Sequence, residues 1–221
     1  MRIVGGMETV LTLGCTGGIG SGKSYVSRIL ARLGYPVYFS DERAKMLYDT
    51  DPLLLEQITT LLGEEVLEGG KINRRTMAGK IFGNETLLRE VEGLVHPAVL
   101  RDFRNWKEAV CRELASAGRK PAFVIFESAI LLESNLVKGC ADKVLHVKAP
   151  YELRIERVMR RDGATRGQVE ERIARQWSDS QRDSMADFVI FADSKKALLP
   201  QIENVVRGMA LAGSGSAGKK I

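Results

Sequence analysis

A glycine-rich segment near the N-terminus constrains this chain more than any other feature. Residues 17–24 read Gly-Gly-Ile-Gly-Ser-Gly-Lys-Ser, which fits the pattern G-x-x-x-x-G-K-[ST] of a phosphate-binding loop. Glycine lets the backbone N–H groups of such a loop approach phosphate oxygens, because no side chain blocks the way. The helix that follows adds the positive end of its dipole to the same site. The segment is therefore expected to lie between a strand and a helix.

The flanking sequence supplies that strand and that helix. Residues 10–14 are a short apolar run, and residues 23–33 repeat apolar side chains on one helical face. A second short strand is predicted at residues 36–39. Later strands are expected at three apolar runs: residues 122–126, 143–147 and 188–191. Because strands alternate with helices, we expect an α/β protein with the P-loop nucleoside-triphosphate hydrolase fold, in which helices flank a five-stranded parallel sheet.

The loop residues point to ATP and Mg²⁺ as ligands. Lys23 can reach the β- and γ-phosphates, and the hydroxyl of Ser24 can hold Mg²⁺. Glu127 ends the strand at 122–126, where an acid that orders the metal often lies. Its position alone makes a role in ordering Mg²⁺ and the absence of such a role equally open. Eight consecutive residues are expected to bind ATP: Gly17, Gly18, Ile19, Gly20, Ser21, Gly22, Lys23 and Ser24.

The chain departs from a simple strand–helix alternation in two places. Residues 51–118 carry long helical patterns with no convincing strand, and Pro97 within them indicates a kink or a new helix start. We therefore predict a core at 8–50 and 119–210, a helical substrate domain at 51–118, and a lid at about 157–177. Residues 211–221 are mostly Gly, Ser and Ala, and are predicted to be a disordered tail.

Arginine is concentrated around the predicted lid. Residues 151–182 contain eight arginines, six acids and no lysine, and the rigid fork of arginine suits phosphate oxygens. The net charge of +5 fits either a nucleic-acid binder or an enzyme of polyanionic small molecules. No aromatic stacking platform interleaves with these arginines, which disfavours nucleic acid. Thr165 is expected to cap the helix that follows the break at 162–163.

Asp41 stands just beyond the predicted strand at 36–39. Ligands bind at the carboxyl ends of parallel strands, so its carboxylate is placed to accept a proton from a hydroxyl or to help order Mg²⁺. It also precedes a helical stretch, where it would serve as an N-cap. The sequence weighs these two roles equally.

The phosphate-binding loop alone does not select a reaction. GTPases share it, but the Asp-x-x-Gly and Asn-Lys-x-Asp motifs of that class are absent from the sequence. Small-molecule kinases place an acceptor region after the second strand and an arginine-rich lid after the fourth, and this chain has both. A nucleoside monophosphate kinase and a non-catalytic nucleotide-binding switch remain alternatives at this point.

Several landmarks together resemble the dephospho-CoA kinase family. They occur in order over roughly residues 10–209: Thr16 to Ser24, Asp41, Arg74-Arg75, His96-Pro97, and Arg157-x-x-x-Arg161-Asp162. The resemblance implies a nucleotide-kinase-like core, a helical domain for the CoA substrate and a lid. It also implies transfer of the γ-phosphoryl group of ATP to the ribose 3′-hydroxyl of dephospho-CoA, the last step of coenzyme A synthesis.

The resemblance also assigns roles. Asp41 matches the catalytic aspartate, and Arg157 and Arg161 match the arginines of the lid. Arg74, Arg75 and His96 are expected to bind the substrate. The residues by themselves fit a solvated helix face as well for the arginine pair, and favour a structural hydrogen bond for the histidine.

Three positions depart from the family pattern. Phe39 stands where the family often has an additional aspartate, so Asp41 would act without that second carboxylate. Ala129 replaces a proline after the third strand. Ala192 replaces an asparagine near the adenine, so backbone groups would have to make that contact.

Composition limits the remaining possibilities. No stretch of the sequence approaches the ~20 apolar residues of a membrane span, and the N-terminus does not read as a signal peptide. The three cysteines are widely and irregularly spaced, which is typical of a reducing cytosol and not of a disulfide framework. We expect a cytoplasmic enzyme whose partner is the small molecule dephospho-CoA, with no nucleic acid, membrane or obligate protein partner. His146, inside a predicted strand, is expected to be an interior residue.

Overall fold

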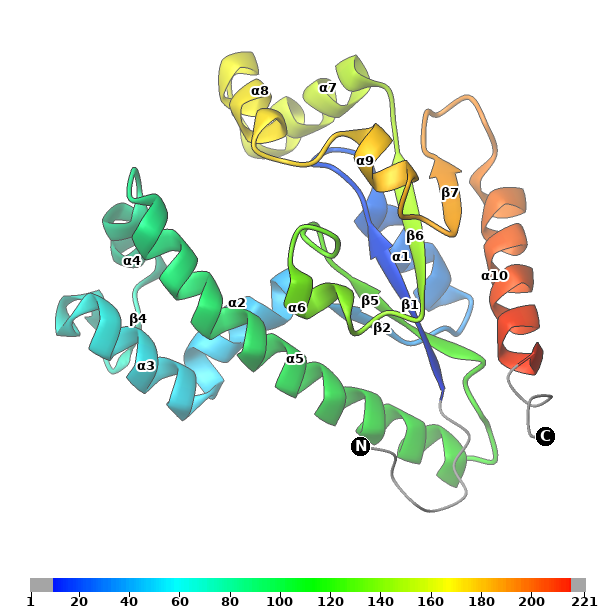
Figure 1. The fold of residues 1–221 in the computed structure, drawn as a ribbon, viewed down its shortest axis with the longest axis horizontal. Helices are drawn as coiled ribbons and strands as arrows, with labels where there is room; N and C mark the ends of the chain where they lie inside the picture. The colour runs from blue at the N-terminus through cyan, green and yellow to red at the C-terminus, as the bar shows by residue number, and fades with distance from the viewer. Residues whose placement is uncertain (1–9, 216–221) are drawn as a thin grey trace. The chain divides into compact units, whose positions relative to one another are not determined.

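A computed structural model describes residues 10–215 of the chain. The described residues divide into two compact units (Figure 1): a sheet unit, residues 10–38 with 109–215, and a helical unit, Phe39–Glu108. The helical unit begins before the segment 51–118 that the sequence indicated. Within the described part of the chain, no helix is long and apolar enough to cross a membrane.

The sheet unit is built on five strands in the order β2-β5-β1-β6-β7. They are β1 (Leu11–Thr16), β2 (Val37–Phe39), β5 (Phe123–Glu127), β6 (Lys143–Lys148) and β7 (Phe188–Phe191). The pairs β1·β5, β1·β6 and β6·β7 are parallel. The predicted five-stranded parallel sheet and α/β fold class are thereby confirmed.

Helices pack on this sheet as the apolar pattern requires. Side chains of α1 (Lys23–Arg32) and α10 (Leu198–Gly215) join the strands in one buried core, which includes Val26, Leu30 and Ile202. All five residues of β5 are buried, as expected of an inner parallel strand covered on both faces. In the register of β1 and β5, Cys15 is opposite Glu127. The end of β5 therefore lies beside the start of the glycine-rich loop.

Four further helices follow the strands of the sheet unit: α6 (Asn135–Lys138), α7 (Tyr151–Asp162), α8 (Arg166–Ala174) and α9 (Asp179–Asp183). Thr165 caps α8 with a complete capping box, as predicted. Helix α10 starts at Leu198 and includes residues 211–215 of the expected tail. Residues 216–221 of that tail lie outside the described residues.

The helical unit contains α2 (Ser40–Thr50), α3 (Pro52–Leu62), a 3₁₀ turn η1 (Glu64–Val66), α4 (Arg74–Ile81) and most of α5 (Glu85–Ser116). Two sequence expectations are wrong here. A small antiparallel hairpin of β3 (Leu67–Glu68) and β4 (Lys71–Ile72) turns through Gly69 and Gly70, both at positive φ, a Gly-Gly signal that sequence reasoning passed over. Pro97 does not begin a helix, because α5 continues through it.

Candidate active site

The glycine-rich loop lies between β1 and α1, as its mechanism requires. Strand β1 ends at Thr16 and α1 begins at Lys23. Gly22 immediately precedes the helix with φ 97° and ψ 11°, a left-handed conformation that side-chain-bearing residues rarely adopt. The loop therefore leads directly into the first turn of α1, where the helix dipole favours an anion.

Three of the predicted residues are joined by hydrogen bonds, in which two of them donate to the carboxylate of the third. Lys23 Nζ donates to Glu127 Oε1 at 2.5 Å, and Ser24 Oγ donates to the same oxygen at 2.8 Å. The side chain of Glu127 is only 2% exposed and that of Lys23 12%. A buried carboxylate needs such partners, because an unpaired charge there costs several kcal/mol. The contact fixes an ammonium group, a hydroxyl and a carboxylate next to the loop.

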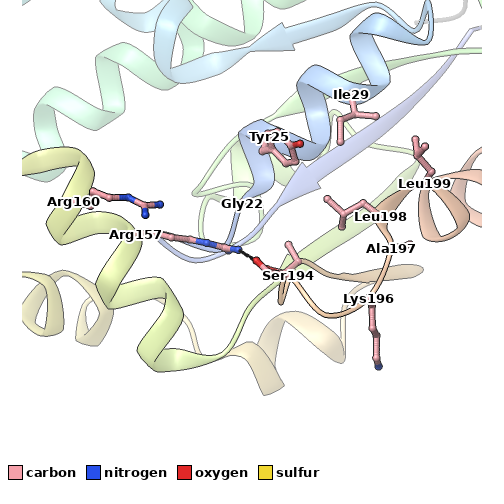
Figure 2. A pocket seen from close by; sticks show the side chains of 11 residues that line it. Gly22, Tyr25, Ile29, Arg157, Arg160, Ser194, Lys196, Ala197, Leu198 and Leu199 are labelled. Atoms are coloured by element: carbon pink, nitrogen blue, oxygen red, sulfur yellow. Dashed lines mark hydrogen bonds between the residues drawn. The ribbon is translucent and has the colours of Figure 1, made fainter.

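Arg157 of α7 reaches the loop from its other side. Its guanidinium donates to the carbonyl oxygens of Gly20 and Ser21, both at 3.4 Å, and to the carbonyl of Ala192 at 2.8 Å. A further donation at 3.4 Å reaches Ser194 Oγ (Figure 2). Arg157 thus connects the phosphate-binding loop with the turn after β7.

A cavity of about 630 Å³ opens beside these groups. Its lining includes Gly22, Tyr25, Ile29, Arg157 and Leu198 (Figure 2), together with Ala192. Most of these side chains are apolar, and the guanidinium of Arg157 supplies a flat cationic surface. Such a concave apolar site with a few fixed polar groups is typical of small-molecule binding.

The two arginines that sequence reasoning paired have different surroundings. Arg161 is exposed and forks onto Asp162, at 2.7 and 3.0 Å, and Arg172 donates to the same carboxylate at 3.1 Å. The hydrogen bond from Arg161 holds the pKa of Asp162 below its ordinary value. In the described contacts only Arg157 of the pair reaches the loop. Arg160, for which no role was predicted from the sequence, lines the cavity instead. Its position three residues after Arg157 on a helix could have predicted that the two side chains lie on the same face.

The other predicted residues belong to the helical unit. Asp41 is the second residue of α2, and Phe39 holds the N-cap position, so the N-cap role considered for Asp41 is wrong. Arg74 and Arg75 open α4, which Asn73 caps through the N–H groups of Arg75 and Thr76. These residues lie in the first turns of two different helices.

His96 lies in the middle of α5 in the helical unit and is partly buried. Burial lowers its pKa, and the nearby Glu92 acts in the opposite direction. The histidine of the sheet unit, His146, is fully buried, as predicted, and its Nδ1 is 2.8 Å from Asp183 Oδ1. Neither histidine is placed by these contacts against the glycine-rich loop.

Comparison with known proteins identifies the family. A family model described as dephospho-CoA kinase matches residues 11–197. The dephospho-CoA kinase of Bacteroides fragilis is 41% identical over 197 residues, which are 89% of this chain and 91% of that protein. The chain belongs to the dephospho-CoA kinase family. The family resemblance predicted from the sequence is therefore confirmed.

Solved structures agree with a dephospho-CoA kinase fold. TT1252 from Thermus thermophilus superposes with a TM-score of 0.69 at 29% identity, over 92% of this chain and 97% of that one. Dephospho-CoA kinase from Campylobacter jejuni gives a TM-score of 0.60 at 21% identity, over 93% and 98%; at that identity the likeness speaks for the fold alone. Family membership makes the chain a kinase, and the solved structures agree with the predicted architecture.

Proposed function

We propose that this protein transfers the γ-phosphoryl group of ATP to the ribose 3′-hydroxyl of dephospho-CoA, yielding coenzyme A and ADP. The observation that carries the proposal is the convergence of Lys23, Ser24 and Glu127 beside a phosphate-binding loop in a chain of this family. In phosphoryl transfer the protein acts mainly by positioning the reactants and neutralising charge. The roles proposed for the site residues are therefore positioning and charge neutralisation.

The triphosphate would bind along residues 17–24, with the N–H groups of the loop on its oxygens. When ATP binds, the ammonium group of Lys23 would shift from Glu127 toward the β- and γ-phosphates. Arg157, already held against the loop, would add a second positive group near the transferring phosphoryl. These charges matter most in the transition state, where the protein offers them without reorganising.

Ser24 and Glu127 suit Mg²⁺. A hydroxyl oxygen and a carboxylate oxygen 2.8 Å apart are the oxygen donors that Mg²⁺ prefers, and this ion usually takes one or two carboxylates together with phosphate oxygens and waters. When bound, Mg²⁺ supplies charge neutralisation for the phosphates. The side chains of Ser24 and Glu127 would orient it.

The cavity beside Arg157 suits the adenine ring. Its apolar walls from Tyr25, Ile29 and Leu198 would shield the ring faces from water. Ala192 offers no side-chain amide here, and its carbonyl oxygen already accepts from Arg157. The ring edge would therefore be recognised by Ser194 and by backbone groups of the turn after β7.

The acceptor would bind to the helical domain, which we place at residues 51–118, together with Asp41. Arg74, Arg75 and His96 would bind dephospho-CoA, whose diphosphate calls for positive charge. Asp41 would orient the 3′-hydroxyl and take its proton late in the transfer. Residues 157–177 would form the lid over ATP, with Arg157 and Arg161 as its catalytic arginines.

We extend the proposal to a cytoplasmic enzyme that works without nucleic acid or an obligate protein partner. Cys15, Cys111 and Cys140 form no disulfide in the described part of the chain, which suits a reducing compartment. Burial raises the pKa of Cys15 to about 12, so this thiol would stay protonated and inert at neutral pH.

A coupled assay of ADP release tests the proposal. With ATP and Mg²⁺ present, ADP should appear only when dephospho-CoA is added, and coenzyme A should form in equal amount. AMP, CMP and shikimate serve as competing acceptors. Far better turnover with any of them would identify another small-molecule kinase, and ATP binding without turnover on any acceptor would identify a nucleotide-binding switch.

A further inference from the structure

The peptide groups around Ile19, in the middle of the glycine-rich loop, are held from two sides by distant side chains. The N–H of Ile19 donates to Gln176 Oε1 at 2.8 Å. Its carbonyl oxygen accepts from Arg154 Nε at 3.0 Å. Both partners come from the segment after β6, more than a hundred residues along the chain. We refer to Ile19, Arg154 and Gln176 as the loop clamp.

The side chain of Ile19 adds a third connection to the same segment. It packs on a small buried cluster formed by Ile155 and Val158 of α7 and Val169 of α8. These helices make up most of the predicted lid. A single loop residue therefore contacts the segment from Arg154 to Gln176 through its N–H, its carbonyl and its side chain.

Arg154 is held firmly in place. Its side chain is 7% exposed, and Nη1 lies 3.5 Å from Asp179. A methyl group added at Gly18 would come within 2.2 Å of the guanidinium, so glycine at this position leaves the space that Arg154 occupies. Burial lowers the pKa of Arg154, and Asp179 acts against this. The guanidinium thus lies directly against the loop backbone.

Gln176 is anchored through the residue that follows it. The N–H of Trp177 donates to Glu133 Oε1 at 3.3 Å, and its carbonyl accepts from Arg182. Arg182 is fully buried and donates to the same Glu133 oxygen at 2.6 Å. A buried ion pair therefore fixes the end of the lid segment at the point where Gln176 reaches the loop.

The clamp has a direct consequence for phosphate binding. An N–H that donates to Gln176 is directed to a protein acceptor and not to a phosphate oxygen. The N–H of Ser21 likewise donates to the carbonyl of Gly18 at 3.0 Å, which leaves phosphate binding to the remaining N–H groups of residues 17–24. A loop fixed by three contacts also has less conformational entropy to lose when a ligand binds, and preorganisation of this kind raises affinity.

We propose that Gln176 and Arg154 are positioning residues that hold the peptide groups of Ile19 and so shape the phosphate-binding loop before ATP arrives. The inference rests on the proposed function to the extent that ATP is the ligand. The chain then uses the base of its lid to set the geometry of the loop, and ATP binding and lid order are coupled through Ile19.

A double-mutant cycle tests the clamp through ATP affinity, measured by calorimetry without an acceptor. Gln176→Met removes the acceptor oxygen and keeps the length of the side chain. Ile19→Pro removes the donor N–H, and Ile19→Ala is its matched control, because it trims the side chain and keeps the N–H. We expect Gln176→Met to weaken ATP binding about tenfold in the wild-type and Ile19→Ala backgrounds, and less than about twofold in the Ile19→Pro background.

Hydrogen exchange supplies a readout that loss of folding stability alone does not change. In the wild type, ATP should slow exchange over residues 157–175; in Gln176→Met this effect should be largely lost at temperatures where the variant is fully folded. If Ile19→Pro does not fold, Gln176→Glu takes its place. It keeps an acceptor oxygen, so it should bind ATP more tightly than Gln176→Met even though its charge opposes the phosphates.

The outcomes separate the two proposals. Unchanged ATP affinity in Gln176→Met, an equal effect of this change in the Ile19→Pro and Ile19→Ala backgrounds, or weaker binding by Gln176→Glu than by Gln176→Met would each overturn the clamp. A wild-type protein that binds ATP but does not phosphorylate dephospho-CoA would overturn the proposed function and leave the clamp standing.

Discussion

The two units of this protein arrange their predicted site residues in contrasting ways. In the sheet unit, Lys23 and Ser24 donate to one oxygen of Glu127, and Arg157 donates to carbonyls of the same loop. In the helical unit, Asp41, the pair Arg74-Arg75 and His96 stand on α2, α4 and α5 respectively.

The contrast follows from the ligands that the units are proposed to bind. A triphosphate is compact and highly charged, so one local loop can hold it with backbone N–H groups and a few fixed charges. Dephospho-CoA is long, and most of its length is neutral, so its recognition would be spread over separate helices. Substitutions in the sheet unit should therefore cause larger losses than substitutions in the helical unit, with Asp41 as the exception.

The largest effect is expected from Lys23→Met. The change removes the positive charge that we assign to the β- and γ-phosphates, so kcat should fall by about 10³-fold. It also leaves the carboxylate of Glu127 buried with only Ser24 as its partner among the contacts described above, and breaking a buried pair in this way costs about 3–5 kcal/mol. Turnover and melting temperature should be measured together, with activity assayed well below the melting temperature.

Lys143→Met is the matched control for this substitution. Lys143 begins β6 and pairs with Asp187 at 2.7 Å, and both side chains are partly exposed. Such a pair contributes little, so kcat should be unchanged. A folded Lys23→Met protein with near-normal kcat would remove Lys23 from the mechanism.

Asp41→Asn should cause the second-largest loss. A base that takes the proton of the acceptor hydroxyl contributes about 10²–10⁴-fold, and we expect kcat to fall by about 10²-fold with little change in the KM for ATP. Glu42→Gln is the matched control, because Glu42 is the other acid in the first turn of α2. Equal kcat values for the two variants would show that Asp41 acts on the helix dipole and not on the hydroxyl.

A smaller effect is expected from Arg75→Ala. Hydrogen bonds to charged groups contribute about 1.5–3 kcal/mol, so loss of a phosphate contact should raise the KM for dephospho-CoA about tenfold and leave the KM for ATP unchanged. Arg89→Ala provides the comparison, since Arg89 is an exposed arginine of α5 paired with Glu85. If both variants raise the KM equally, the effect is one of general surface charge.

The smallest effect concerns acid stability in the sheet unit. Burial raises the pKa of Asp183, but hydrogen bonds from Lys148 and His146 outweigh it and hold this pKa below its ordinary value. A carboxylate with a lowered pKa stabilises the folded state above its unfolded pKa of about 3.9, and this contribution is lost as pH falls through the folded pKa.

Asp183→Asn removes this titration. Its free energy of unfolding at neutral pH should be lower by less than about 1 kcal/mol, because the side chain is partly exposed. The difference from the wild type should shrink as pH falls below about 4, in urea titrations at several pH values. A constant difference across that range would contradict the assignment.

Local features of the sheet unit could be predicted from the sequence because they depend on neighbouring residues. The phosphate-binding loop, the strands and the cap at Thr165 follow from spacing, apolar runs and turn chemistry. The contacts of Gln176 and Arg154 with Ile19 could not be predicted, since they join residues that only the folded sheet brings together. The different surroundings of Arg157 and Arg161 depend in the same way on where α7 packs.

The helical unit was harder to predict for a physical reason. Its helices bury side chains on faces that a single sequence shows only weakly, and its hairpin is two residues on each side, too short for a pattern of alternation. The turn at Gly69-Gly70 could have been predicted from its two consecutive glycines, but it was not. The new helix start considered at Pro97 was wrong, because α5 continues through this residue in spite of the missing N–H.

The most direct test of the central claim is to locate the phosphoryl group after reaction. The protein would be incubated with dephospho-CoA and ATP labelled at the γ-phosphate, and the product examined by mass spectrometry and ³¹P nuclear magnetic resonance. We predict one added phosphoryl group, all of it on the ribose 3′-oxygen, with ADP formed in equal amount. Label on another hydroxyl, or label found only in inorganic phosphate, would contradict the account.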